Sequence, residues 1–144
     1  MAFRMKDILE QLGVEVILTR KDIGNVTLQQ RVKIANSVPD LDLFVSLHSN
    51  AAGNSGWYKA KGYIIYTSQA GDSAKRNIAA KAVLKHVAEA GITIRNGGLT
   101  HSPLYVLRHT VAPAILIEHG FHANREEVAM FKTGCTRTLK RGLP

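Results

Sequence analysis

The stretch Leu-Phe-Val-Ser-Leu-His-Ser-Asn, residues 43–50, decides the fold predicted for this chain. Residues 41–47 are nearly all apolar, which is typical of a strand covered on both faces in a parallel sheet. Such a strand delivers His48 to its carboxyl end, where ligands bind in open α/β sheets. A histidine at the end of a buried strand also occurs for purely structural reasons, so both interpretations stay open at this point.

A second apolar strand has the same design. Pro113 introduces the run Ala-Ile-Leu-Ile at residues 114–117, and the run ends in Glu118. If the two strands are neighbours and run in the same direction, His48 and Glu118 reach the same edge of the sheet. Burial disfavours the ionised form of a carboxyl group at such a strand end, which suits a proton shuttle. The alternative is a capping or salt-bridge carboxylate that faces Arg108 or Arg125.

Helices and further strands alternate along the rest of the chain. Helical spacing predicts helices at residues 2–12, ended by Gly13, and at 28–36, opened by a Thr27-x-x-Gln30 capping box and stopped by Pro39. A long helix begins at Asp72 or Ser73 and ends before Gly91, and a last helix opens at Asn124 and ends near residues 133–134. The buried stripe expected for the long helix is Ala79, Ala82, Val83, His86 and Ala90.

Strands are predicted at residues 14–18, 62–67 and 104–107, with a short edge element at 92–95 and a turn at 96–98. Residues 50–61 are rich in glycine and asparagine and are expected to form a rim loop. This alternation predicts a single α/β domain over residues 1–144, a three-layer sandwich in which helices flank a mostly parallel central sheet.

Composition restricts the partners. The chain has 144 residues, 45% of them hydrophobic, and a net charge of +8, so it is expected to attract polyanions such as nucleic acid, anionic lipid or wall polymer. It has no pattern of a nucleic-acid-binding module, so we expect no nucleic-acid partner. A single cysteine, Cys135, excludes an internal disulfide framework and offers no Cys-His pattern for a thiol nucleophile. No apolar run is long enough to span a bilayer, and the first residues lack the apolar region of a signal peptide.

Five segments of the chain resemble, in the right order, the zinc-dependent N-acetylmuramoyl-L-alanine amidases, which are cell-wall hydrolases of bacteria and their phages. They are residues 18–20 (Leu-Thr-Arg), 28–36 (Leu-x-x-Arg-x-x-x-Ala-Asn), 42–51 (Asp-Leu-Phe-Val-Ser-Leu-His-Ser-Asn-Ala), 104–108 (Leu-Tyr-Val-Leu-Arg) and 113–127 (Pro-Ala-Ile-Leu-Ile-Glu-His-Gly-Phe-x-x-Asn-x-x-Glu). The resemblance implies that His48 is a zinc ligand and that Glu118 is the catalytic acid and base.

The resemblance also exposes a departure from the family pattern. The family's other two zinc ligands, a histidine in a Gly-His-Gly-Gly type segment and a glutamate at the start of the first helix, have no counterpart in this sequence. We therefore expect a family member that lacks its N-terminal strand and part of its C-terminal helix. Four other histidines could substitute as ligands: His101, His109, His119 and His122. We do not expect this, because the three-residue spacing of His119 and His122 places two side chains on one face only in a helix, and Gly120 predicts a turn there. His122 is expected to line the groove instead.

The activity implied by the resemblance is hydrolysis of the amide bond between N-acetylmuramic acid and the L-alanine of the stem peptide. Zn²⁺ would activate a water, and Glu118 would move its proton to the leaving amine. Expected substrate-binding residues are Asn50, Trp57, Arg108 and His122. Trp57 and its neighbours Tyr58 and Lys59 either grip glycan or peptide or pack back on the domain, and Arg108 either binds a peptide carboxylate or forms a structural salt bridge.

The implied partner is peptidoglycan at the cell wall, bound by a monomer, with no nucleic acid and no membrane span. The alternative function is that of a catalytically inactive fragment or homologue that binds cell-wall polymer.

Overall fold

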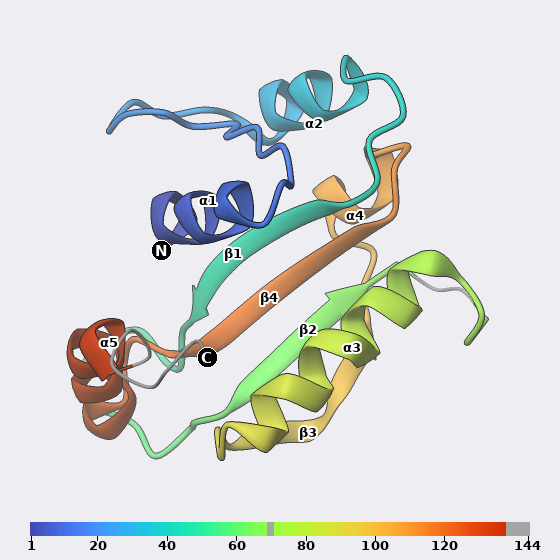
Figure 1. Cartoon of the computed structure of the whole chain (residues 1–144). Helices are drawn as coiled ribbons and strands as arrows, with labels where there is room; N and C mark the ends of the chain where they lie inside the picture. The colour runs from blue at the N-terminus through green and yellow to red at the C-terminus, as the bar shows by residue number, and fades with distance from the viewer. Residues whose placement is uncertain (69–70, 138–144) are drawn as a thin grey trace.

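A four-stranded mixed sheet forms the centre of the molecule (Figure 1). The computed structural model describes residues 1–68 and 71–137, and side chains are described up to residue 132. The strands lie in the order β1 (Phe44–Asn50), β4 (Ala114–Phe121), β2 (Tyr63–Thr67) and β3 (Ile94–His101). β1 is parallel to β4 and β2 is parallel to β3, whereas β2 and β4 are antiparallel. The predicted α/β sandwich with a mostly parallel sheet is confirmed.

The two apolar strands pair as predicted. Val45 lies opposite Ile115 and Leu47 opposite Ile117 in the parallel ladder of β1 and β4. β4 is an interior strand, with Ile115 fully buried, while β1 forms the edge and has Phe44 as its one buried residue. The prediction of a strand that begins at residue 41 and is covered on both faces was therefore wrong: β1 begins at Phe44, and the residues that follow are only partly covered or are exposed, since an edge strand has a neighbour on one side only.

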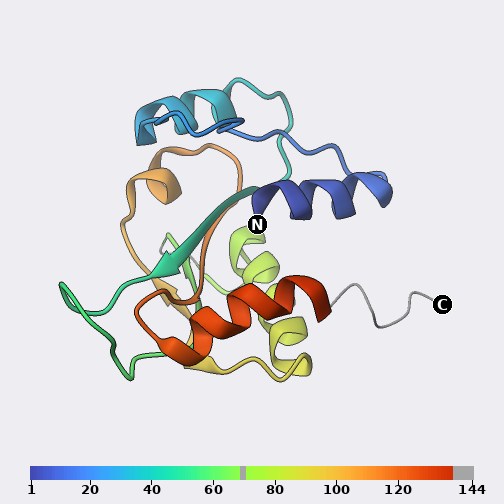
Figure 2. The same ribbon diagram turned by 90° about the vertical axis from the view of Figure 1, so that its left-hand side faces the viewer.

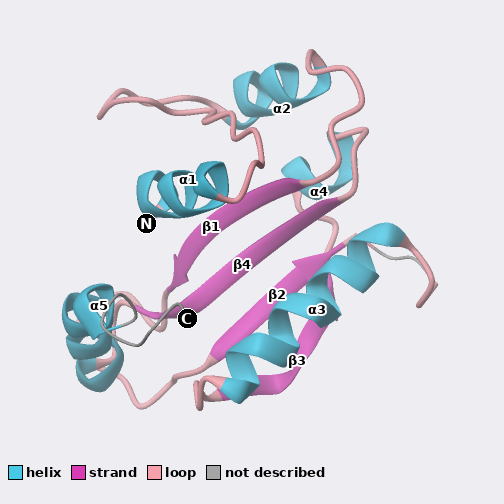
Figure 3. Ribbon diagram, viewed as in Figure 1, coloured by secondary structure: helices cyan, strands magenta, loops and turns pink. Residues whose placement is uncertain are grey.

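Helices cover both faces of the sheet (Figures 2 and 3). On one face, α2 (Leu28–Asn36) and α4 (Tyr105–His109) pack on Phe44 and Leu116. On the other face, α3 (Lys75–Glu89) packs on Ile65, Ile115 and Ile117. α1 (Ala2–Gln11) lies on the same side as α3 and buries none of its residues, and α5 (Arg125–Arg137) lies at the carboxyl ends of β1 and β4.

Local sequence explains where several helices begin and end. At α2, the Thr27 hydroxyl accepts a hydrogen bond from the Gln30 N–H and the Gln30 side chain accepts one from the Thr27 N–H, which completes the predicted capping box. The Asn124 side chain accepts a hydrogen bond from the Glu127 N–H at the start of α5. Gly13 follows α1 with a φ of 80°, a conformation that glycine adopts without strain.

Two predicted strands were wrong. Residues 14–18 are extended but pair with no strand in the part of the chain that the structure describes, and strand propensity without a ladder partner does not make a strand. Residues 104–107 contribute to the short helix α4, in which Val106 and Leu107 are both buried. An apolar run this short fits a buried helical turn as well as a strand, so periodicity did not separate them. The turn expected at 96–98 lies inside β3 as an irregularity: Asn96, Gly97 and Gly98 all have positive φ, and the pairing with β2 shifts register across them.

The face that α3 buries was also placed incorrectly. Ala82, His86 and Ala90 are exposed, while Asn77 and Ala80 are buried and Val83 packs beside them. Alanines occur on several sides of this helix, so small apolar residues did not define its buried stripe. Asp72 does not cap the helix and instead forms an ion pair with Lys81, and Ala74 occupies the N-cap. No helix among the described residues is long and apolar enough to cross a membrane.

Gly120, near the end of β4, allows α5 to approach the sheet. Its φ is 134°, and an added Cβ would lie 2.8 Å from Cζ of Phe131 and 3.0 Å from Cδ of Glu127. Only a residue without a side chain fits this position, because the neighbours include a buried carboxylate and an aromatic ring.

Replacing Gly120 with alanine should lower the free energy of unfolding by about 1–3 kcal/mol, because the new methyl group collides with α5. Urea unfolding followed by circular dichroism measures this loss. Gly91→Ala is the control, since Gly91 has a positive φ of 73° but nothing within 4 Å of an added Cβ. Equal losses in the two variants would show that backbone strain, and not contact with α5, explains the effect.

Candidate functional site

His48 and Glu118 are direct partners in the parallel ladder at the carboxyl ends of β1 and β4. Side chains alternate between the two faces of a strand, so both lie on the face that also carries Phe44 and Leu116. α2 and α4 pack on the Phe44 end of this face, and His48 at the other end is exposed. The predicted juxtaposition of an imidazole and a carboxyl group is therefore present.

Glu118 has the environment of a proton carrier. Its Oε2 atom is buried and has no hydrogen-bond partner. Burial raises the pKa of the Glu118 carboxyl, and the nearby charge of His122 partly opposes this shift. Neither Arg108 nor Arg125 forms an ion pair with it in the described part of the chain, so the salt-bridge alternative is not realised. A carboxyl group without an internal partner is free to exchange a proton with a substrate or a water.

His48 favours the neutral imidazole. Partial desolvation of the ring, which is only in part covered by protein, and the positive charge of Arg31 lower the pKa of His48. The Ser46 hydroxyl lies 2.9 Å from its Nε2 atom, which leaves Nδ1 without a protein partner among the described residues. Sequence reasoning missed Ser46, although a polar residue two positions earlier on the same strand face points to such a contact. Neutral imidazole is the form that binds metal ions.

His122 is held beside these two residues by β1. Its Nδ1 atom lies 3.1 Å from the Ser49 hydroxyl and 3.2 Å from the Ser49 carbonyl oxygen, and its backbone N–H donates to the carbonyl of Asn50. Because a carbonyl only accepts, this geometry places the proton on Nδ1 and leaves Nε2 available. The Asn50 side chain accepts a hydrogen bond from the N–H of Ala51 and so shapes the start of the following loop.

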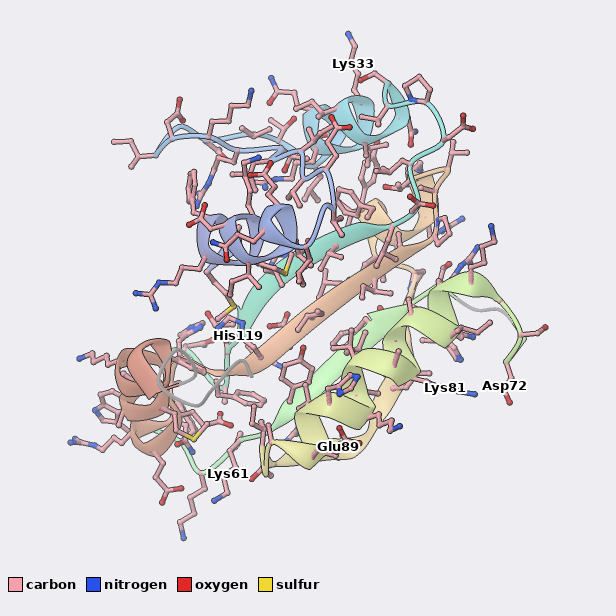
Figure 4. The ribbon with its side chains drawn as sticks, viewed as in Figure 1. Lys33, Lys61, Asp72, Lys81, Glu89 and His119 are labelled. Atoms are coloured by element: carbon pink, nitrogen blue, oxygen red, sulfur yellow. The ribbon has the colours of Figure 1, made fainter. Side chains whose placement is uncertain are left out.

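The side chains of the other histidines do not form a cluster with that of His48. His119 follows Glu118 on β4 and points to the opposite face (Figure 4), where its ring interacts with the backbone of His48 and contacts Phe131 at a centroid distance of 4.8 Å. His101 ends β3 at the opposite edge of the sheet and contacts Thr67, because β2 and β3 run antiparallel to β4. His109 is stacked on Tyr105 in α4.

His48 was expected to be a zinc ligand whose two family partners have no counterpart in this sequence. Among the described side chains, no group of three His, Cys, Asp or Glu residues lies close enough together to hold a metal ion. A catalytic zinc takes three protein ligands, and His48 is the only expected ligand at this edge. The side chain of Cys135 lies outside the described residues.

A loop at residues 51–61 forms the rim of the site. It surrounds a hollow of about 380 Å³ that is also lined by His122. Trp57 is 52% exposed, and the guanidinium of Arg125 lies 4.7 Å from its ring centroid. Tyr58 packs against Gly53 within the loop and is less exposed. Both aromatic rings thus pack partly on the protein, as one expected alternative has it. Trp57 also remains accessible to a ligand, as the other alternative requires.

Glu127 fixes this loop to the end of β4. Its buried carboxylate accepts hydrogen bonds from the N–H of Gly62 at 2.7 Å and from the N–H of Phe121 at 2.6 Å. In the sequence, Glu127 stood out only as the last residue of the fifth segment that resembles the amidase family. Its role in holding the loop was missed because the bond to Gly62 spans 65 residues of sequence. Arg108 is exposed on α4 and makes no ion pair among the described residues.

The sequence matches a known family and known relatives. Residues 1–138 match the sequence model of the N-acetylmuramoyl-L-alanine amidases. The chain is 32% identical over 143 residues to the N-acetylmuramoyl-L-alanine amidase CwlM of Bacillus licheniformis, covering 99% of this chain and 53% of that protein. It is 32% identical over 130 residues to the endolysin of Bacillus phage SPP1, covering 90% of this chain and 47% of that protein. The chain therefore spans about half the length of these relatives.

Solved structures share the fold. The catalytic domain of CwlV, an N-acetylmuramoyl-L-alanine amidase from Bacillus (Paenibacillus) polymyxa var. colistinus, superimposes with a TM-score of 0.72 at 31% identity, covering 93% of this chain and 70% of that domain. The apo form of the amidase Ami1 from Mycobacterium abscessus gives a TM-score of 0.75 at 28% identity, covering 90% of this chain and 64% of that one.

The raised pKa of Glu118 predicts how stability depends on pH. Because the fold disfavours the ionised carboxylate, the free energy of unfolding of the wild type, relative to that of Glu118→Gln, should fall as the pH rises from 4.5 through the raised pKa. Denaturant unfolding of both proteins between pH 4 and 8, with a chelator present, measures the difference. A difference that is constant or grows with pH would contradict the assigned environment of Glu118.

Proposed function

Since this chain belongs to the N-acetylmuramoyl-L-alanine amidase family, we propose that it cleaves the amide bond between N-acetylmuramic acid and the L-alanine of the stem peptide in peptidoglycan. The observation that supports this activity best is the pairing of Glu118 with His48 at the open edge of the sheet, with a buried carboxylate oxygen left without a partner.

Glu118 is the proposed general base and acid. Its carboxylate accepts a proton from the water that attacks the amide carbonyl, and it then gives this proton to the leaving nitrogen of L-alanine. Burial raises the pKa of this carboxyl. The protonated form of Glu118, which exists between the two proton transfers, is therefore easier to reach. No covalent intermediate is needed, because water is the nucleophile.

Residues at the rim position the substrate in this proposal. His122 lines the hollow and keeps Nε2 available for the substrate, since Ser49 holds its other ring nitrogen. Trp57 forms the outer wall of the same hollow. The Asn50 side chain holds the start of the loop through its hydrogen bond with the Ala51 N–H. Arg108 on α4, the helix that packs on the same face of the sheet as Glu118, is proposed to bind a peptide carboxylate through its guanidinium. We further propose that the protein acts as a monomer at the cell wall and has no nucleic-acid partner.

Zinc stays a prediction, with His48 as the one residue proposed to bind it. The described side chains do not provide the two further protein ligands that a catalytic zinc takes, so no step of the proposed reaction is assigned to the metal.

The accessible Trp57 ring at the hollow that His122 lines supports a second candidate function. A homologue that holds peptidoglycan in the same groove without cleaving it would use His122 and Trp57 and would not need Glu118 as a proton carrier. Pelleting of the protein with insoluble wall material, in the absence of any released amine, would identify this function.

The amidase proposal predicts release of free amino groups of L-alanine from purified peptidoglycan. Glu118→Gln should reduce the rate roughly 10²–10⁴-fold, because it removes the proton carrier while keeping the shape of the side chain. Glu89→Gln, which changes an exposed glutamate on α3, is the control and should leave the rate unchanged. Equal rates for wild type and Glu118→Gln would contradict the proposed role, and no release by the wild type would leave the binding function in its place.

The zinc prediction is tested separately by NMR spectroscopy of the imidazole groups. Added Zn²⁺ should shift the ring signals of His48 at lower concentrations than those of His86, an exposed histidine on α3. His48→Ala should remove the tightest binding, and His86→Ala should not. Zinc-dependent shifts that leave His48 unchanged would exclude it as a ligand.

A further inference from the structure

A second hollow adjoins Trp57. It has a volume of about 510 Å³ and is lined by the loop residues Trp57, Lys59 and Lys61 and by Asn124, Arg125 and Glu126 at the start of α5. Trp57 is the one lining residue that this hollow shares with the hollow beside His122. We call it the basic hollow. The proton transfer assigned to Glu118 does not require the basic hollow.

The basic hollow has an excess of positive charge. Three cationic side chains line it against one carboxylate, that of Glu126. Lys61 (Figure 4) forms an ion pair with Glu126 at 3.1 Å, and the Lys61 side chain is about half exposed while that of Glu126 is largely exposed. Lys59 has no ion pair among the described residues, and the guanidinium of Arg125 lies over the Trp57 ring instead of meeting a carboxylate. Two positive charges are thus left uncompensated in one depression.

The backbone around the basic hollow is already fixed. The Asn124 side-chain amide donates to the carbonyl oxygens of Tyr58 and Ala60, at 3.2 Å each. The N–H of Tyr58 donates to the carbonyl of Ala123 at 2.8 Å, and Glu127 holds the end of the loop at Gly62. A ligand that binds here does not have to order the loop first, which lowers the entropic cost of binding.

The chemistry of the lining residues selects a ligand that carries a negative charge. A guanidinium presents donors in a planar fork that matches carboxylate and phosphate groups. The position of Arg125 on the indole of Trp57 fixes that fork at the wall of the hollow, and Lys59 adds a mobile positive charge at the rim. The exposed part of the Trp57 ring can pack against an apolar portion of the same ligand.

We propose that the basic hollow binds an anionic group, a carboxylate or a phosphodiester, of the cell-wall polymer and so holds the polymer while its amide lies at Glu118. The identity of the polymer rests on the proposed function, but the anion site itself does not. Two sources carry this chemistry, the stem-peptide carboxylates of peptidoglycan and the phosphodiester groups of polymers attached to it.

The test measures pelleting of the full chain with insoluble walls at 4 °C, in a Glu118→Gln background that keeps the polymer intact. The double variant Lys59→Gln/Arg125→Gln removes both uncompensated charges. The control Lys33→Gln/Lys75→Gln removes the same charge from exposed sites on α2 and α3, away from the basic hollow. Thermal unfolding of each protein checks that it is folded.

The dissociation constant should rise roughly tenfold in the hollow variant and less than about twofold in the control, as expected for losing two partly exposed ion pairs. Walls treated with hydrofluoric acid, which removes phosphodiester polymers, distinguish the two sources. If the difference between the variants survives treatment, stem-peptide carboxylates are the ligand, and if it disappears, phosphodiesters are.

Equal weakening in the hollow variant and the control would overturn the proposal, because attraction would then follow net charge alone. Unchanged binding in the hollow variant, or no pelleting of the parent protein, would overturn it as well. The outcome is independent of amine release: hollow-dependent pelleting by a protein that releases no amine would retain the anion site and reject the amidase activity.

Discussion

The parallel pairing of β1 with β4 is the constraint on which the site depends. It places the carboxyl ends of two strands side by side, and its register puts His48 directly opposite Glu118. A shift of one residue would turn one of these side chains to the other face, where His119 lies. The apolar pairs that precede them, Val45 with Ile115 and Leu47 with Ile117, hold this register because their burial on the α3 face depends on it.

A second set of contacts connects this edge to its surroundings. The buried carboxylate of Glu127 joins the end of β4, the end of the rim loop and the first turn of α5. Gly120 leaves the space that this carboxylate and Phe131 occupy. The position of Trp57, and therefore of both hollows beside it, follows from these contacts, since α5 supplies Arg125 to its ring and Asn124 to the loop backbone. The two hollows are therefore built from the same contacts that fold this edge of the sheet.

The sequence was sufficient to predict the pairing of His48 with Glu118, because two apolar runs with the same design each end in an ionisable residue. Capping residues such as Thr27 and Asn124 were equally readable, since they act on backbone within three positions. Contacts between segments far apart in the sequence could not be predicted from it. The bond from Ser49 to His122 spans 73 residues, and nothing local in either segment indicates it. Short apolar runs failed for a different reason: residues 14–18 needed a neighbouring strand, and residues 104–107 suited a helix equally well.

We propose that the scissile amide of a muramoyl peptide lies at Glu118, on the face of the sheet shared with His48. A crystal structure of Glu118→Gln with a bound N-acetylmuramoyl-L-alanyl peptide would show where this amide binds. We expect it within hydrogen-bond reach of the substituted side chain, roughly 2.6–3.2 Å or through one water, with the sugar or peptide in the hollow lined by His122. A ligand bound at the opposite edge of the sheet, near His101, or with its amide remote from position 118, would contradict it.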